Sequence, residues 1–347
     1  MQSGRYVAGF DTLRACAVIT VMIYHVNKDV PELHLFPVFR HGYLGVDLFF
    51  VLSGFLITGI LLRTRTEAHF LRNFYARRVL RIWPLYFAIL LLTFILLPMA
   101  GPAYKGLIEA NCRPIIAYPL FVQNLFRSPC IGPVEVTWSL AIEEQFYLVW
   151  ALFVIFLSNK VLTRLCVAVI VLSPLFRYLA FHSGWPDEYV YRFTLTRLDG
   201  LAAGCFLAFV PLRLRYSVAM FLAGGVGLLL VLRLQWIPLI GSFALLCFSG
   251  IILMANRGRV VPTWAPLGYL GKISYGLYLL HVPVFDTVRK FLHPHGVAQS
   301  IAVLAVDISA AIVAASVSWY FLESPILRWK QRFGSESIAT RPLRQTG

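Results

Sequence analysis

Ionisable side chains that could perform chemistry occur at regular spacings within strongly apolar stretches of the chain. Arg14 and His25 are eleven residues apart, and on an α-helix this spacing is close to three turns. It places both side chains on one face, about 16 Å apart along the axis. They cannot contact each other, but one extended ligand could touch both.

A thioester on a phosphopantetheine arm, as in acetyl-CoA, has the shape that this spacing requires, with phosphates at one end and a reactive carbonyl at the other. Arginine suits the phosphates because its guanidinium stays charged and bonds them bidentately. Imidazole suits the carbonyl end because it titrates near neutral pH and can act as a general base. His25 could deprotonate an incoming hydroxyl or carry the acyl group itself, and the sequence leaves both routes open.

Carboxylates near the same end of the apolar segments could assist His25 in catalysis. Asp47 lies about one turn inside the second segment, and Glu143 and Glu144 lie in the fourth. Adjacent helical residues point about 100° apart, so both glutamates cannot face one site. We assign Glu143 to the site because it shares a helical stripe with Ser139. Asp47 or Glu143 could orient His25 as a carboxylate does in a triad.

Other polar residues are candidates for binding an acceptor. Tyr278 and His281 share one face of the ninth segment, although a lone histidine there could equally be structural and bonded to backbone. Arg197 and Asp199 open the sixth segment, where an ion pair between them is the simplest structural interpretation. We predict Ser139, Arg197, Tyr278 and His281 as acceptor-binding residues and expect no metal site.

Three arginines lead into the third apolar segment, namely Arg77, Arg78 and Arg81. Together with Arg14 they form a basic layer near one end of the spans, which we predict to bind the phosphates of the donor. The alternative is that they anchor the helix by binding anionic lipid headgroups.

The composition indicates that these residues lie in a membrane. The chain has 347 residues, of which 59% are hydrophobic and 14% charged, against about a quarter charged in soluble domains. A hydrocarbon core of about 30 Å needs roughly 20 apolar residues. About ten windows of this kind occur, near residues 8–27, 43–63, 82–100, 138–157, 163–181, 195–211, 216–233, 236–255, 268–290 and 299–322.

The sequence therefore predicts an all-α polytopic membrane protein, a bundle of about ten transmembrane helices. This domain covers residues 1–333, and the polar tail 334–347 is expected to be disordered. The net charge of +15 arises from Lys and Arg in alternate connections, as the positive-inside rule describes. It argues against nucleic-acid binding and predicts that both termini are cytoplasmic.

The long connection between the third and fourth segments allows two interpretations. Cys112 and Cys130 could form a disulfide if this connection faces an oxidising compartment, or both could be free thiols. The apolar patch Ile115–Phe126 could form a re-entrant or interfacial helix. Gly200 and Gly204, four residues apart in the sixth segment, would let another helix approach closely.

Seven sequence runs together are similar to those of a known family. They are GFDTLRA (Gly9–Ala15) followed by Tyr24 and His25, GVDLFFVLSGFLIT (Gly45–Thr58), FYARRVLRIWPLY (Phe74–Tyr86), TWSLAIEEQFYLVW (Thr137–Trp150), RLDGLAAG (Arg197–Gly204), ISYGLYLLHVPV (Ile273–Val284) and FLESP (Phe321–Pro325). Their types and order resemble the acyltransferase 3 family of membrane O-acyltransferases over nearly the whole chain.

The resemblance implies a bundle of about ten helices in a bacterial inner membrane. It implies transfer of an acetyl or other short acyl group onto sugars of O-antigen, exopolysaccharide, peptidoglycan or similar glycans. It assigns catalysis to His25 paired with Arg14. The donor-binding arginines of the family correspond to Arg77, Arg78 and Arg81, and its acidic motif to Glu143 and Glu144.

Our leading hypothesis is transfer of an acyl group from cytoplasmic acyl-CoA to a hydroxyl of an envelope glycan or lipid-linked sugar, with membrane lipid around the protein. A glycan or lipid flippase is the alternative, but such transporters contain inverted repeats, and the sequence has no internal symmetry of this kind. A third alternative, a helical scaffold, would leave unexplained both the basic layer and the carboxylates and histidines near the other end of the spans. The sequence does not fix the oligomeric state.

Overall fold

The computed structural model describes residues 7–29, 40–101, 106, 108–109, 112, 114–127, 132–210, 213–234, 237–258, 261–292 and 296–333. These residues form helices and turns, and no strand occurs among them. The predicted all-α polytopic class is confirmed, whereas the tail 334–347 lies outside the described residues.

Every predicted apolar window contains a helix. These helices are α1 (Ala8–Asp29), α2 (Leu44–Thr64), α3 (Phe70–Leu91), α6 (Trp138–Phe156), α7 (Asn159–His182), α9 (Leu198–Phe209), α10 (Leu214–Arg233), α11 (Ile237–Asn256), α13 (Ser274–Arg289) and α14 (Val297–Ser318). Eight helical segments of the described chain are long and apolar enough to cross a membrane. Two of the windows hold helices that are shorter than predicted. Helix α9 has 12 residues and helix α13 has 16 residues.

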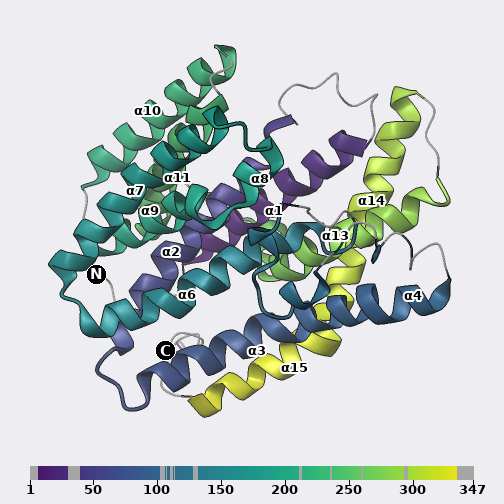
Figure 1. Ribbon diagram of the computed structural model, residues 1–347, viewed down its shortest axis with the longest axis horizontal. Coiled ribbons are helices and arrows are strands. Elements are labelled where there is room, and N and C mark those ends of the chain that lie inside the picture. The colour runs from purple at the N-terminus through teal and green to yellow at the C-terminus, as the bar shows by residue number, and fades with distance from the viewer. Residues whose placement is uncertain are drawn as a thin grey trace, which may run out of the picture.

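Short helices connect or extend these elements. They are α4 (Leu97–Ala100), α8 (Asp187–Arg192), α12 (Ala265–Lys272) and α15 (Ser324–Leu327). Helix α1 lies in the middle of the bundle and packs against α2, α11, α12 and α13. Helices α7, α9, α10 and α11 gather on one side of it, and α3, α14 and α15 lie on the other (Figure 1).

Glycines bring α2 and α9 into backbone contact. A Cβ atom on Gly204 would lie 2.0 Å from the Val51 carbonyl oxygen, and one on Gly54 would lie 2.1 Å from the Leu201 carbonyl oxygen. No other residue type fits at this separation, so the close approach predicted at the glycine pair of the sixth window is confirmed. It brings the N-terminal ends of α2 and α9 together, where their charged residues lie.

The segment Ile115–Phe126, which the structure describes in full, does not form the predicted re-entrant or interfacial helix. Two 3-10 turns, Ile115–Ala117 and Gln123–Leu125, take its place. Pro119 interrupts this run, and proline cannot donate the backbone hydrogen bond that a continuous helix needs. The turns pack onto α3, where the rings of Tyr86 and Phe121 stack with centroids 4.4 Å apart.

The structure describes only one of the two cysteines that were predicted to form a disulfide in the connection before α6. Cys112 is disulfide-bonded, which agrees with one of the two predicted states. Cys130 lies outside the described residues, so its part in that bond stays a prediction.

Candidate active site

Two histidines from distant parts of the chain meet in the centre of the bundle. His25 of α1 and His281 of α13 have ring centroids 4.9 Å apart. Nε2 of His281 lies 3.3 Å from Nδ1 of His25. His281 has no exposed surface, whereas His25 is partly exposed. The sequence singled out both residues but did not predict that they touch.

The backbone fixes where the protons sit on both rings. Nδ1 of His25 lies 3.0 Å from the Val21 carbonyl oxygen, and Nδ1 of His281 lies 3.0 Å from the Leu277 carbonyl oxygen. A carbonyl oxygen can only accept a hydrogen bond, so each Nδ1 carries the hydrogen of a neutral ring. The single Nδ1–H of His25 is then shared between the Val21 carbonyl oxygen and Nε2 of His281, which accepts at the longer distance. This leaves a lone pair on Nε2 of His25, the form a general base needs.

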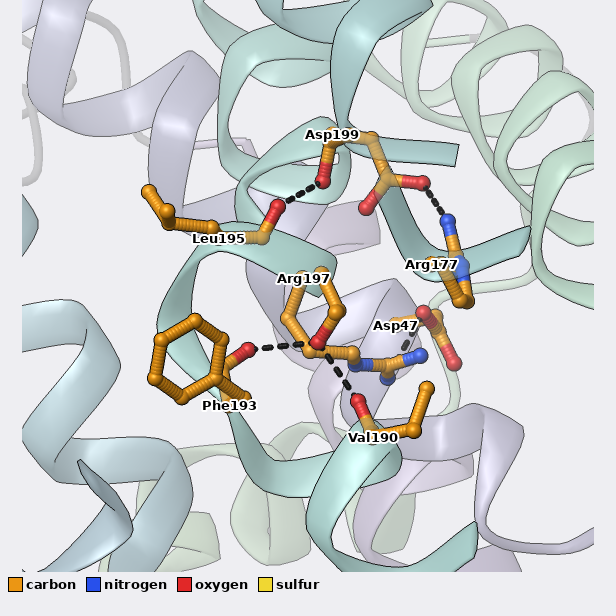
Figure 2. Close-up of polar contacts among 9 residues, drawn as sticks. Asp47, Arg177, Val190, Phe193, Leu195, Arg197 and Asp199 are labelled. Carbon is orange, nitrogen blue, oxygen red and sulfur yellow. Dashed lines mark hydrogen bonds and ion pairs between the residues drawn. The ribbon is translucent and has the colours of Figure 1, made fainter. Parts of the chain in front are cut away.

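The carboxylate predicted to orient His25 has another partner. Oδ1 of Asp47 lies 2.9 Å from Nη2 of Arg197. The predicted ion pair between Arg197 and Asp199 is wrong, because Asp199 pairs with Arg177 of α7 instead. Figure 2 shows the two ion pairs side by side, joining α7, α2 and the beginning of α9.

Arg197, predicted to bind the acceptor, lies deep inside the protein. Only 3% of it is exposed, and its guanidinium carbon lies 4.6 Å from the ring centroid of Tyr191 and 5.9 Å from those of Trp138 and Phe50. An aromatic cage and a carboxylate therefore enclose its charge. The sequence analysis missed Arg177, although an arginine within a predicted span was itself a signal.

We expect these ion pairs to stabilise the fold strongly. The Arg197→Met variant should lose about 3–5 kcal/mol because the Asp47 carboxylate stays buried without its counter-ion. The double variant Asp47→Asn/Arg197→Met should regain most of that loss because it buries no lone charge. Thermal unfolding of the three proteins in one detergent measures both effects. Equal destabilisation of the single and double variants would contradict this assignment.

The predicted stripe on α6 begins with a link to α13. Oγ of Ser139 and the hydroxyl oxygen of Tyr278 lie 2.7 Å apart. The Tyr278 hydroxyl also donates to the Val136 carbonyl oxygen at 3.1 Å. Both side chains are buried. These two predicted acceptor-binding residues therefore bond to each other and hold the two helices in register.

Further along the stripe, Glu143 lies among arginines. The charges of Arg78 and Arg81 act on its carboxylate without forming an ion pair, and the hydroxyls of Tyr147 and Ser53 lie beside it. These two hydroxyls bond to each other. Glu143 was predicted to assist His25. In the structure it lies instead in the electric field of the predicted donor-binding residues Arg78 and Arg81.

Arg78 and Arg81 of α3 form a cluster with Arg14, which lies in the N-terminal half of α1. The guanidinium carbon of Arg78 lies 4.7 Å from the ring centroid of Tyr147. Arg81 is solvent-exposed and close enough to Arg14 and Arg78 for mutual repulsion, which Glu323 partly offsets. Cationic groups held together in this way attract an anion such as a phosphate.

The remaining predicted donor ligands differ in their surroundings. Nη1 of Arg14 forms an ion pair of 2.6 Å with Oδ1 of Asp11, one turn earlier on α1. Arg77 is buried and only 8% exposed, so it offers less surface to a ligand than Arg81.

In the described part of the chain no group of three His, Cys, Asp or Glu side chains could hold a metal ion.

Apolar helices around a histidine pair and a guanidinium cluster are typical of a polytopic membrane enzyme. The chain belongs to the family described as "Acyltransferase domain", whose sequence profile matches residues 7–323. The match covers all the helices that carry the histidine pair and the arginine cluster.

Curated relatives are similar over almost the whole chain. "O-acetyltransferase OatA" of Staphylococcus aureus (strain MRSA252) is 32% identical over 384 residues, which cover 100% of this chain and 60% of that protein. "Peptidoglycan O-acetyltransferase OatA" of Listeria monocytogenes is 30% identical, covering 93% and 56%. "Putative peptidoglycan O-acetyltransferase YrhL" of Bacillus subtilis is 30% identical, covering 94% and 55%.

The chain thus spans between 55% and 60% of the length of these relatives. No solved structure matches it.

Proposed function

We propose that this protein transfers an acetyl or other short acyl group from cytoplasmic acyl-CoA to a hydroxyl of a cell-envelope glycan. The observation that carries the proposal is the hydrogen-bonded pair of His25 and His281, which leaves a lone pair on Nε2 of a partly exposed imidazole. The family and the names of the relatives support acyl transfer.

The donor enters at the arginine cluster. Arg14, Arg78 and Arg81 bind its phosphates, since guanidinium groups form charge-assisted hydrogen bonds with phosphate oxygens. Arg14 lies about three helical turns from His25 along α1, a length that the phosphopantetheine arm spans. The thioester carbonyl therefore reaches the imidazole while the nucleotide stays at the other end of the helix.

The transfer step converts the thioester of the donor into an oxygen ester of the acceptor. The acceptor hydroxyl gives its proton to Nε2 of His25 while its oxygen attacks the thioester carbonyl carbon. The carbon–sulfur bond breaks, an oxygen ester forms, and the leaving thiolate takes the proton back from His25. In the alternative route, Nε2 of His25 attacks the thioester carbonyl carbon and the thiolate leaves, so that the acyl group rests on Nε2. The hydroxyl then attacks this acyl carbon, the carbon–nitrogen bond breaks, and the hydroxyl proton goes to the thiolate.

The chemistry and the names of the relatives support a proposed acceptor and location. We assign the protein to the bacterial inner membrane, with both termini in the cytoplasm and the histidine pair toward the outer face. Two of the relatives carry peptidoglycan in their names, so we favour peptidoglycan over O-antigen or exopolysaccharide as the glycan. Mass spectrometry of envelope glycans should show ester groups that disappear when the gene is deleted.

A direct assay separates this function from the flippase alternative. Purified protein in lipid nanodiscs should release coenzyme A from acetyl-CoA and form ester-linked acetate when a soluble peptidoglycan fragment is added. A flippase would move glycan or lipid without consuming acetyl-CoA, so the absence of both products would refute the proposal.

His281 should act as a positioning residue for His25. The His281→Ala variant removes the second acceptor of the His25 Nδ1–H, beside the Val21 carbonyl oxygen, and the ring that packs against His25. We expect the rate of acyl transfer to fall about 10- to 100-fold, the loss that follows when a partner that orients a metal-bound imidazole is removed. His281→Gln places an amide oxygen near the lost Nε2 and should recover part of the rate. Equal activity of the alanine and glutamine variants would argue that His281 only fills space.

A further inference from the structure

An apolar groove lies between α6, α7 and α9, and no residue assigned to catalysis or donor binding lines it. It holds about 330 Å³, and its walls include Phe146, Val149 and Phe153 of α6 and Leu165 of α7. Val149 is 46% and Phe153 39% exposed, so the groove opens to the outside of the bundle. Helices α6 and α7 both belong to segments that are long and apolar enough to cross a membrane. The groove therefore opens toward lipid.

The groove exists because α6 and α7 separate from a tight connection. Only Leu157 and Ser158 join the end of α6 to the beginning of α7, and the two helices diverge from this turn (Figure 1). Helix α7 packs along α9, whereas α6 has few contacts with either of them. The short helix α9 contributes Leu198 and Ala202 to the wall of the space that is left.

Two polar side chains, Gln145 and Thr194, line the groove at the end farther from this turn. Oγ1 of Thr194 donates to Oε1 of Gln145 at 2.6 Å and accepts from Nδ2 of Asn124 at 2.8 Å. Nε2 of Gln145 donates to the Phe121 carbonyl oxygen at 2.7 Å and to Oδ1 of Asn124 at 2.8 Å. Apart from the thiol of Cys166, the other lining side chains are aliphatic or aromatic. The groove therefore suits an apolar occupant, since water would find no unpaired polar group on these two side chains.

Exposed basic residues lie at the end of the groove near the turn. Lys160 and Arg164 are in the first two turns of α7, and both are exposed. Arg164 directly precedes Leu165 of the groove wall. Arg65 reaches the same end, since its Nη1 donates to Oδ1 of Asn159, the first residue of α7, at 3.0 Å. Basic groups beside an apolar groove between membrane helices match the phosphate and the chain of an anionic lipid.

We propose that the groove binds one acyl chain of an anionic membrane phospholipid, whose phosphate meets Lys160 and Arg164. Gln145 and Phe153 are eight residues apart, so the groove follows α6 for about 12 Å from the basic end toward the polar end. A bound chain fills this space and holds α6 at its distance from α7 and α9. Lipid binding of this kind is independent of the proposed acyl transfer, because it needs only a protein embedded in a membrane.

Native mass spectrometry of the full chain in detergent, titrated with dioleoyl phosphatidylglycerol, measures the affinity for the first bound lipid. The Val149→Trp variant places a large ring in the groove and should weaken binding at least about 10-fold, the factor that corresponds to 1.4 kcal/mol. Ile155→Trp is the matched control, because Ile155 is 40% exposed on the same helix and does not line the groove. It should bind the lipid as the wild type does.

The basic end is tested by a second pair of variants. Lys160→Ala/Arg164→Ala should weaken phosphatidylglycerol binding about 10- to 30-fold, which follows from about 1 kcal/mol for each basic side chain near a lipid phosphate. Arg213→Ala/Arg215→Ala removes the same charge from exposed positions at the beginning of α10 and should have no effect. Dioleoyl phosphatidylcholine has the same chains and no net charge, and it should bind at least about 10-fold more weakly than phosphatidylglycerol.

Equal affinity of the Val149→Trp and Ile155→Trp proteins would overturn the proposal, because the lipid would then bind elsewhere. Equal affinity of the wild type for the two lipids, or of the two double variants for phosphatidylglycerol, would overturn it as well, since any lipid chain would then fill the groove. A dimer that carries no lipid would assign the groove to a helix of a second copy. The titration contains no acyl donor or acceptor, so none of these results bears on the proposed function.

Discussion

Replacement of His25 by alanine is expected to lower the rate of acyl transfer by about 10²–10⁴-fold, the range that a general acid–base group contributes. The variant removes the only nitrogen lone pair that we assign to the acceptor proton, so the hydroxyl would have to attack without being deprotonated. The measurement is the initial rate of ester formation from acetyl-CoA and a peptidoglycan fragment, at equal amounts of folded protein.

His182 provides a matched control for this experiment. It lies on α7, it is exposed, and its Nδ1 is 3.0 Å from the carbonyl oxygen of Tyr178 four residues earlier. His25 makes the same backbone contact to Val21. His182→Ala therefore removes an imidazole with the same local geometry and should leave the rate unchanged. A His25→Ala variant that transfers at the wild-type rate would remove His25 from the mechanism.

The second large effect is expected from the arginine cluster. Arg78→Ala and Arg81→Ala should each weaken acetyl-CoA binding about 10- to 100-fold, since a hydrogen bond to a charged group is worth about 1.5–3 kcal/mol. The maximal rate at saturating donor should change less, because the reacting carbonyl is held at the other end of α1. Isothermal titration with acetyl-CoA measures the first effect, and kcat at saturating donor measures the second.

Arg72 is the control for the cluster. It is exposed and lies in the first turn of the same helix, α3, so Arg72→Ala removes an equal charge from the same element. We expect its donor affinity to match the wild type. If the Arg78 and Arg81 variants also bind acetyl-CoA normally, the arginines anchor the helix to anionic lipid headgroups, as the alternative interpretation held.

The sequence by itself predicted the class of fold and much of the chemistry along single helices. A window of about 20 apolar residues has few options in a membrane, because backbone groups in hydrocarbon must bond within the segment. The relation between Arg14 and His25 is likewise a property of one helix, so its period alone places them on one face. The approach of α2 to Gly204 could also be predicted, since a residue without a side chain removes the barrier to contact.

The tertiary structure alone decided which side chains from different helices meet. His281 rather than Asp47 touches Nδ1 of His25, Asp47 pairs with Arg197, and Arg177 takes Asp199. Spacing along a chain fixes the direction of a side chain on its own helix, but not the rotation and crossing angle of the neighbouring helix. Buried charges then take the nearest opposite charge, since an unpaired one costs several kcal/mol. The partners of these groups therefore depend on the packing of the whole bundle.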